Sequence, residues 1–247
     1  VLATEEKKTR PGYGVHLEGV HPSYDLHTIR PDWFKPRVAA LAFLPDGRLL
    51  VSTWDSIGGV YMLDNLETND TSQITIKRIA AGLAEPLGME VVDGEIFVLQ
   101  KQELTQLIDH DGDEIIDEYR SICDDWGATA DFHEFAFGLV YKDGYFYANL
   151  SLAMRLKSHE RQHPDRGRTI RIDRDGNYEP LNLGLRTPNG IGIGVDGEIF
   201  MTDNQGRWLP GNKVIHLQEG AFHGSRAVLQ DSLPDLKETP PAVWLPQ

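Results

Sequence analysis

The stretch Gly138-Leu-Val-Tyr-Lys-Asp143-Gly144-Tyr-Phe-Tyr-Ala-Asn149 decides the fold, because two apolar runs meet there at an Asp-Gly pair. Asp-Gly between alternating apolar runs is a strong hairpin signal, since a tight turn needs positive φ and glycine adopts it freely. The pattern recurs three times elsewhere in the chain. The other copies are Leu41-Ala-Phe-Leu-Pro-Asp46-Gly47-Arg-Leu-Leu-Val-Ser52, Met89-Glu-Val-Val-Asp93-Gly94-Glu-Ile-Phe-Val-Leu99 and Gly192-Ile-Gly-Val-Asp196-Gly197-Glu-Ile-Phe-Met-Thr202.

The spacing of the four pairs indicates the architecture. They begin at Asp46, Asp93, Asp143 and Asp196, so successive pairs lie 47, 50 and 53 residues apart. A repeat of about 50 residues that holds a hairpin is typical of propeller blades. We therefore predict an all-β fold, a β-propeller, whose functional loops gather at one end of a central channel.

The repeats divide the chain into a lead-in over 1–35, which brings in the first strand, and propeller blades over 36–247. Four units are readable, and a closed propeller usually has more than four blades. We therefore expect the chain to be part of a larger propeller, six-bladed or similar, that the chain end truncates; a four-bladed domain is the alternative. The expected units are 36–80, 81–130, 131–180 and 181–230.

The charge of the chain argues against several classes of partner. Among 247 residues the formal net charge is −14, so we expect neither nucleic acid nor an anionic membrane surface as a partner. No run of eighteen apolar residues occurs, so we expect no membrane insertion. The single cysteine, Cys123, excludes an internal disulfide.

Part of the acidity is concentrated in one loop. Residues 109–118 hold six carboxylates in ten positions, and acids on alternate residues wrap oxygens round one point, as Ca²⁺ requires. We predict a structural Ca²⁺ site here, and a solvated acidic turn is the alternative. The expected ligands are Asp109, Asp111, Asp113, Asp117 and the backbone carbonyl of Ile115.

The fourth repeat resembles the sorbosone dehydrogenase and soluble glucose dehydrogenase family. The matching segments are Gly184-Leu-Arg186-Thr-Pro188-Asn189-Gly190, Asp203-Asn204-Gln205-Gly206, Asn212-Lys-Val-Ile-His216 and Gly220-Ala-Phe-His-Gly224. That family consists of β-propeller quinoproteins, which hold pyrroloquinoline quinone (PQQ) and Ca²⁺ over the channel mouth and oxidise sugars.

The resemblance implies roles for particular residues. Arg186 takes the place of the arginine that contacts the quinone, and a planar guanidinium suits that task. His133 takes the place of the general base on the sugar hydroxyl, because neutral imidazole can accept a proton near neutral pH. The further cofactor residues implied are Asn189, Asn204, Gln205 and Gly206, the last three forming a turn that helps to seat the cation.

The sequence also departs from the family pattern. Thr187 stands where the family has asparagine after the arginine, and the acid that orients the family's histidine is missing after the third hairpin, where Asn149 and its neighbours stand. Structural roles remain open: His133 could be a buried, hydrogen-bonded histidine, and Arg186 an inter-blade arginine.

The leading hypothesis is a PQQ- and calcium-dependent dehydrogenase acting on sugars or aldehydes. It implies a small carbohydrate substrate, an electron-acceptor protein and a periplasmic or secreted location. Two alternatives remain: a metal-dependent propeller lyase or hydrolase acting on carbohydrate, and a non-catalytic propeller that binds glycan or a partner protein.

Overall fold

The protein is an all-β propeller, seen in a computed structural model that describes residues 24–68, 70–157, 159–205, 211–228 and 236–245. Within the described residues, sixteen strands form four antiparallel sheets of four, each ordered along the chain. Blade 1 comprises β1 (Val38–Phe43), β2 (Leu49–Thr53), β3 (Val60–Asp64) and β4 (Thr75–Ala80), with the 3₁₀ turn η1 (Leu66–Thr68) between β3 and β4. Blade 2 comprises β5 (Gly88–Val92), β6 (Glu95–Leu99), β7 (Leu104–Ile108) and β8 (Glu118–Cys123). Blade 3 comprises β9 (Ala136–Lys142), β10 (Tyr145–Leu150), β11 (Arg168–Asp173) and β12 (Tyr178–Pro180). Blade 4 comprises β13 (Pro188–Ile193), β14 (Ile199–Asp203), β15 (Asn212–His216) and β16 (Val243–Leu245).

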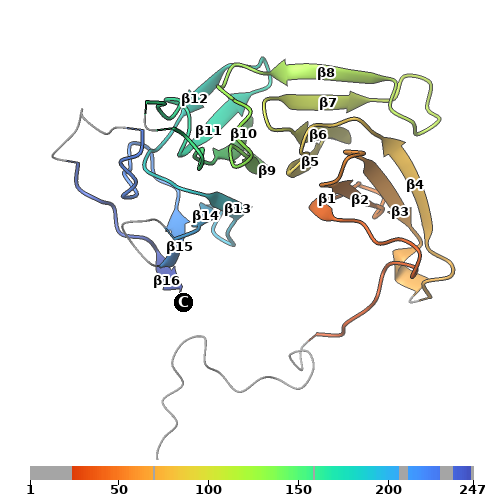
Figure 1. Ribbon diagram of the computed structural model, residues 1–247. Coiled ribbons are helices and arrows are strands. Elements are labelled where there is room, and N and C mark those ends of the chain that lie inside the picture. Colours follow the sequence, from red (N-terminus) through yellow and green to blue (C-terminus); the bar gives the residue numbers. More distant parts are fainter. Residues whose placement is uncertain (1–23, 69, 158, 206–210, 229–235, 246–247) are drawn as a thin grey trace, which may run out of the picture.

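The blades stand side by side around an axis. Their first strands contact one another in the order β1, β5, β9 and β13, so these strands line the inside (Figure 1). The described blades form an arc, with blades 1 and 4 at its two ends. The fourth blade takes its outer strand from 243–245, which lies after the unit expected at 181–230.

The four Asp-Gly pairs of the repeats, which begin at Asp46, Asp93, Asp143 and Asp196, each join a first strand to a second strand, as the hairpin pattern predicts. In two of them, including Asp143-Gly144, both residues have positive φ. At Asp46-Gly47 only the glycine has positive φ, and Pro45 precedes the pair. Pro45 suits the first central position of a type I turn. The connection between β1 and β2 is therefore longer than a two-residue hairpin turn.

Apolar side chains from facing sheets fill the spaces between blades. The largest cluster joins blades 2 and 3, where the Phe97 and Phe146 rings lie 4.6 Å apart. A second cluster joins blades 1 and 2 through Leu50, Met89 and Val98. This inter-blade packing fixes the inner strands, and therefore fixes where their connecting loops meet.

The strand order determines which loops share an end of the channel. Within a blade the first strand begins where the second strand ends, because the two are antiparallel. The segments before β9 and β13 and those after β10 and β14 therefore lie at one end. The Asp-Gly turns lie at the opposite end, together with the loop between β7 and β8.

Candidate functional site

The segment that enters β9 is held in place by Asp131. Its carboxylate accepts hydrogen bonds from the backbone N–H groups of His133 (2.9 Å), Met154 (3.2 Å) and Arg155 (3.0 Å). Burial raises the pKa of Asp131, but these N–H groups outweigh it and the net pKa is lowered. Asp131 thus joins the start of β9 to the segment that follows β10.

His133 is half-buried, and its ring is oriented by a backbone carbonyl. Nδ1 lies 2.9 Å from the carbonyl oxygen of Leu152. Because a carbonyl only accepts, Nδ1 carries the proton in the neutral ring, and the lone pair falls on Nε2. Nε2 lies 3.5 Å from Thr187 Oγ1, on the side of the ring that faces blade 4. The Leu152 carbonyl thus orients the ring.

The main chain of Leu152, whose carbonyl contacts the His133 ring, also binds Arg186. Its carbonyl accepts a hydrogen bond from the Leu152 N–H at 2.9 Å. Its Nη1 lies 3.3 Å from both Thr187 Oγ1 and Asn204 Oδ1. The structure therefore brings together His133, Arg186 and Asn204, from the ends of three different strands.

Asp203, at the end of β14, fixes the backbone that carries Arg186. It is 2% exposed, and Oδ1 accepts the N–H groups of Arg186 (3.2 Å) and Thr187 (2.8 Å). Burial raises the pKa of Asp203, and Lys213, with its Nζ 3.9 Å away, opposes this. Lys213 is itself buried and donates to the carbonyl of His223 at 2.5 Å.

The remaining residues expected to bind the cofactor have fewer contacts with His133 and Arg186. Asn189 is exposed on β13, and the described hydrogen bonds do not link its side chain to His133 or Arg186. Gln205 is exposed, and its N–H donates to Asn212 Oδ1 at 2.9 Å. Gly206 lies outside the described residues, so its predicted role stays a prediction.

An aromatic wall runs beside His133. The Phe135 ring lies 5.5 Å from the His133 ring and 5.8 Å from the ring of Trp54, which follows β2. Trp54 is partly exposed, so an apolar ring face borders the opening. Such a face suits the C–H surface of a sugar ring.

A cavity of about 730 Å³ adjoins this group on the blade 4 side. Among the described residues, its walls are the segment after β10 and residues from 222–227 and 236–238, which lie outside the strands. Arg186 lines it, and its Nη1 lies 3.3 Å from Thr187 Oγ1, the atom that also lies 3.5 Å from His133 Nε2. Sequence reasoning missed this cavity because irregular segments build it.

The acidic loop joins β7 to β8 at the opposite end of the channel. Ligand oxygens of Asp109, Asp111 and Asp117 all lie within 4.8 Å of one another. Asp113 is not in this group; its Oδ1 accepts the N–H of Ile115 at 2.7 Å. Burial raises the pKa of Asp109, but N–H groups from Gly112 and its neighbours make the net shift a lowering.

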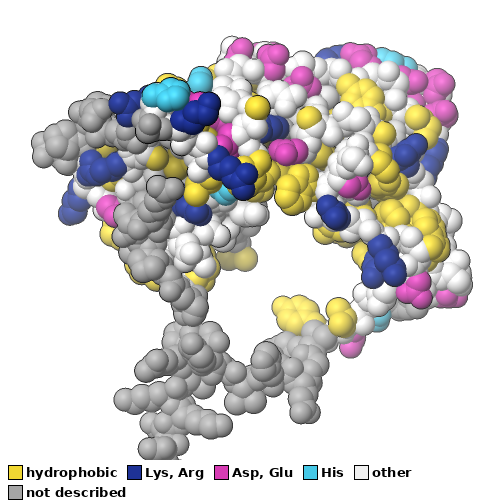
Figure 2. Space-filling model, in the orientation of Figure 1, with side chains coloured by type: hydrophobic (Ala, Val, Ile, Leu, Met, Phe, Trp, Pro, Cys, Tyr) yellow, Lys and Arg dark blue, Asp and Glu magenta, His cyan; other side chains and the backbone are white. Residues whose placement is uncertain are grey.

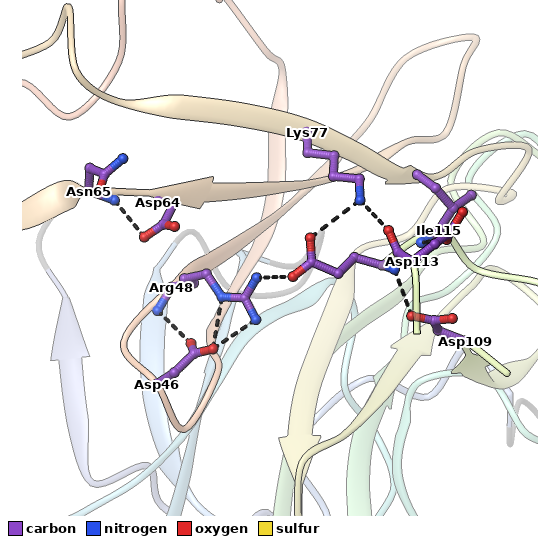
Figure 3. A network of polar contacts seen from close by, with 9 residues as sticks. Asp46, Arg48, Asp64, Asn65, Lys77, Asp109, Asp113 and Ile115 are labelled. Atoms are coloured by element: carbon purple, nitrogen blue, oxygen red, sulfur yellow. Dashed lines mark hydrogen bonds and ion pairs between the residues drawn. The ribbon is translucent and has the colours of Figure 1, made fainter. Parts of the chain in front are cut away.

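Basic side chains of blade 1 bind the acidic loop (Figure 3). Glu114 accepts a hydrogen bond from Arg48 Nη1 at 2.5 Å and lies 3.3 Å from Lys77 Nζ, and Lys77 also donates to the Asp113 carbonyl. These cations lower the pKa of Glu114. The cluster lies far from His133, at the other end of the blades, so a cation there would have a structural role.

Solved structures share the fold of this chain. An oxidoreductase described as a glucose dehydrogenase, from Thermus thermophilus, is 18% identical, with a TM-score of 0.63 over 86% of this chain and 71% of that one. PQQ-bound aldose sugar dehydrogenase from Streptomyces coelicolor is 14% identical, with a TM-score of 0.66 over 89% and 70%. The PQQ domain of pyranose dehydrogenase from Coprinopsis cinerea is 15% identical, with a TM-score of 0.61 over 85% and 59%.

At these identities the similarity establishes the propeller fold. No protein-family model matches the sequence, and no curated protein matches it. In the described part of the chain no helix has the length and apolar character to cross a membrane.

Proposed function

We propose that the chain belongs to a dehydrogenase that oxidises sugars or aldehydes with PQQ and Ca²⁺. The observation that carries the proposal is the backbone of Leu152, which binds His133 on one side and Arg186 on the other. His133, a base whose tautomer is fixed, and the positively charged side chain of Arg186 then lie at the same opening of the channel. The solved structures of similar fold include sugar dehydrogenases, one of them with PQQ bound.

The residues at the opening fit a quinone that carries carboxylates. Arg186 uses Nη1 for its contacts with Thr187 and Asn204, and its Nε and Nη2 have no hydrogen-bond partner among the described residues. A guanidinium edge with two spare donors matches carbonyl and carboxylate oxygens. When bound, the quinone would supply the acceptor for the hydride of the sugar.

His133 would then hold and move the hydroxyl proton. Its Nε2 lone pair accepts the proton, while the Leu152 carbonyl keeps Nδ1–H in place and stabilises the imidazolium that results. Thr187 Oγ1, 3.5 Å from Nε2, can orient the hydroxyl. Trp54 and Phe135 would exclude water from one side. The electron-acceptor protein and a periplasmic or secreted location are part of the same proposal.

The experiment adds PQQ and Ca²⁺ to the purified chain and follows dye reduction with a panel of sugars. We expect His133→Gln to lower the rate by about 100-fold or more, since a positioned base contributes about 10²–10⁴. PQQ binding, followed by its absorbance, should survive in His133→Gln and weaken in Arg186→Gln. His216→Gln is the matched control, because His216 is paired with Glu198 at the other end of blade 4. An unchanged rate in His133→Gln would refute the proposal.

We also propose a structural Ca²⁺ at Asp109, Asp111 and Asp117. Three carboxylates that lie so near one another repel when no cation is bound, so the cation should stabilise the folded loop. At 1 mM Ca²⁺ we expect Tm to rise by a few degrees, about 1–2 kcal/mol of linkage. Asp109→Asn should abolish the rise. Asp70→Asn, an exposed acid in the β3–β4 connection, should retain it.

A further inference from the structure

An aromatic side chain beside the candidate site leaves a ring face open. Trp54, the residue directly after β2, is 48% exposed, and it lies at the end of the channel where β10 and β14 also end. Its ring meets the Phe135 ring in a T-shaped contact, with centroids 5.8 Å apart and planes at 84°. Because such a contact uses at most one face of the indole, the other face is available to a ligand. Figure 2 shows hydrophobic side chains along the inner border of the arc.

The two described phenylalanine rings that contact His133 are less available. Phe135 is buried and contacts both the His133 ring and the Trp54 ring. Phe132 is exposed, but the Arg155 guanidinium covers one face of its ring, 4.6 Å from the centroid. Trp54 therefore offers the open aromatic face, and Phe135 separates it from His133.

Hydrogen bonds hold the loop that carries Trp54 in place. The Trp54 N–H donates to the Arg37 carbonyl at 2.8 Å. Asp55 Oδ1 accepts the N–H groups of Ile57 (2.9 Å) and Gly58 (3.1 Å). The indole Nε1–H has no hydrogen-bond partner among the described residues, so it can donate to a ligand. A fixed ring with a donor at its edge suits a sugar, because a sugar combines an apolar C–H face with hydroxyl groups.

We propose that Trp54 binds the second sugar of an oligosaccharide whose terminal sugar lies at His133. A pyranose with equatorial substituents presents its axial C–H bonds as an apolar face, which fits the open indole face. Because Phe135 separates the two rings, a sugar on Trp54 lies next to the sugar at His133 rather than over it. Cellobiose, a disaccharide of two such sugars, is the simplest ligand of this class. Its oxidation rests on the proposed dehydrogenase, but its binding does not.

An NMR titration of the chain without PQQ measures binding, with cellobiose and glucose as ligands and the indole N–H signals as the readout. We expect cellobiose to bind about tenfold more tightly than glucose, the factor that one well-placed aromatic contact contributes. Cellobiose should also shift the signal of Trp54, which is assigned by its loss in Trp54→Phe.

Trp54→Ala should remove the preference for cellobiose, and Trp54→Phe should keep part of it, because a smaller aromatic face remains. Trp244→Ala is the matched control and should keep the whole preference. Trp244 is 49% exposed, nearly the same as Trp54, but it lies on β16, the outer strand of blade 4.

Three results would overturn the proposal. They are equal affinity of the native chain for cellobiose and glucose, an equal loss in Trp244→Ala, and release of cellobiose when PQQ is added, which would assign the Trp54 face to the quinone. Another result concerns the enzyme alone: cellobiose that binds on Trp54 but is not oxidised with PQQ and Ca²⁺ supports the sugar site and counts against the proposed dehydrogenase.

Discussion

At the scale of single residues, Asp203 shows how a buried charge can hold a surface group. Its carboxylate binds the backbone of Arg186 and Thr187, so it fixes the main chain from which the half-buried Arg186 side chain extends. Lys213 balances that charge from inside the blade. A buried ion pair of this kind adds little net stability, but losing one partner is costly.

Asp203→Asn should therefore destabilise the protein by about 3 kcal/mol, because it removes the main counter-charge of the buried Lys213 ammonium. The double variant Asp203→Asn/Lys213→Met should recover part of that loss. Urea unfolding of the three proteins measures the effect. A single variant as stable as the native protein would contradict the role given to the pair.

His223 is a second buried group, and it makes stability depend on pH. It is 1% exposed, both ring nitrogens lack a partner among the described residues, and burial, with Lys213 nearby, lowers its pKa to about 4. The unfolded chain, with an ordinary histidine pKa of about 6.5, therefore binds the proton first as pH falls. Stability from this group is present above a pH of about 6.5 and is lost as pH falls toward about 4.

Between pH 7 and pH 5 the native protein should lose about 2 kcal/mol through His223. His223→Leu should lack that part of the slope, which unfolding free energies at the two pH values would reveal. Should the variant fail to fold, an NMR titration of the native protein serves instead. A His223 ring that titrates near its ordinary pKa of about 6.5 would contradict the prediction.

At the scale of elements, the Asp-Gly turns set the register of the inner hairpins. Gly94 has φ +85°, and Asp93 before it also has positive φ. A side chain at Gly94 meets no neighbour within 4 Å, so any cost of adding one comes from the backbone conformation.

Gly94→Ala should cost about 1 kcal/mol, the penalty for an L-residue in the left-handed region. Gly192→Ala is the matched control, because Gly192 also has no neighbour within 4 Å and no positive φ. Thermal unfolding should separate the two variants by a few degrees. Equal Tm values would show that the turn does not depend on glycine.

The hairpins were predictable because their signal is local, and most of the site was not. Alternating apolar runs around Asp143-Gly144 specify a hairpin within twelve residues. The orienting partner of His133 is a carbonyl nineteen residues away, and the resemblance suggested an acid instead. Asp203 belongs to the segment 203–206 that resembles the dehydrogenase family, yet its burial and its pairing with Lys213 depend on packing between elements.

At the scale of the whole molecule, the arc leaves apolar side chains exposed at its ends. On β1, Ala40 and Ala42 face blade 2, whereas Leu41 and Phe43 point away and are 56% and 64% exposed. Trp244 on β16 is 49% exposed at the other end. Contiguous exposed apolar side chains favour association.

Leu41→Thr/Phe43→Thr should therefore lower self-association, as sedimentation at several concentrations would measure. The free energy of unfolding should change by less than about 1 kcal/mol, because both side chains are largely exposed and threonine suits a strand. If the double variant unfolds much more easily while associating as before, this face packs against the protein itself.

The role of residue 152 has a consequence for mutational scans. Both of its hydrogen bonds use main-chain atoms, so replacing Leu152 by another apolar residue preserves the imidazole tautomer. Only proline, which lacks the N–H, removes the bond to the Arg186 carbonyl. A library of apolar replacements at this buried position would therefore look permissive, although the tautomer of the His133 ring depends on its main chain.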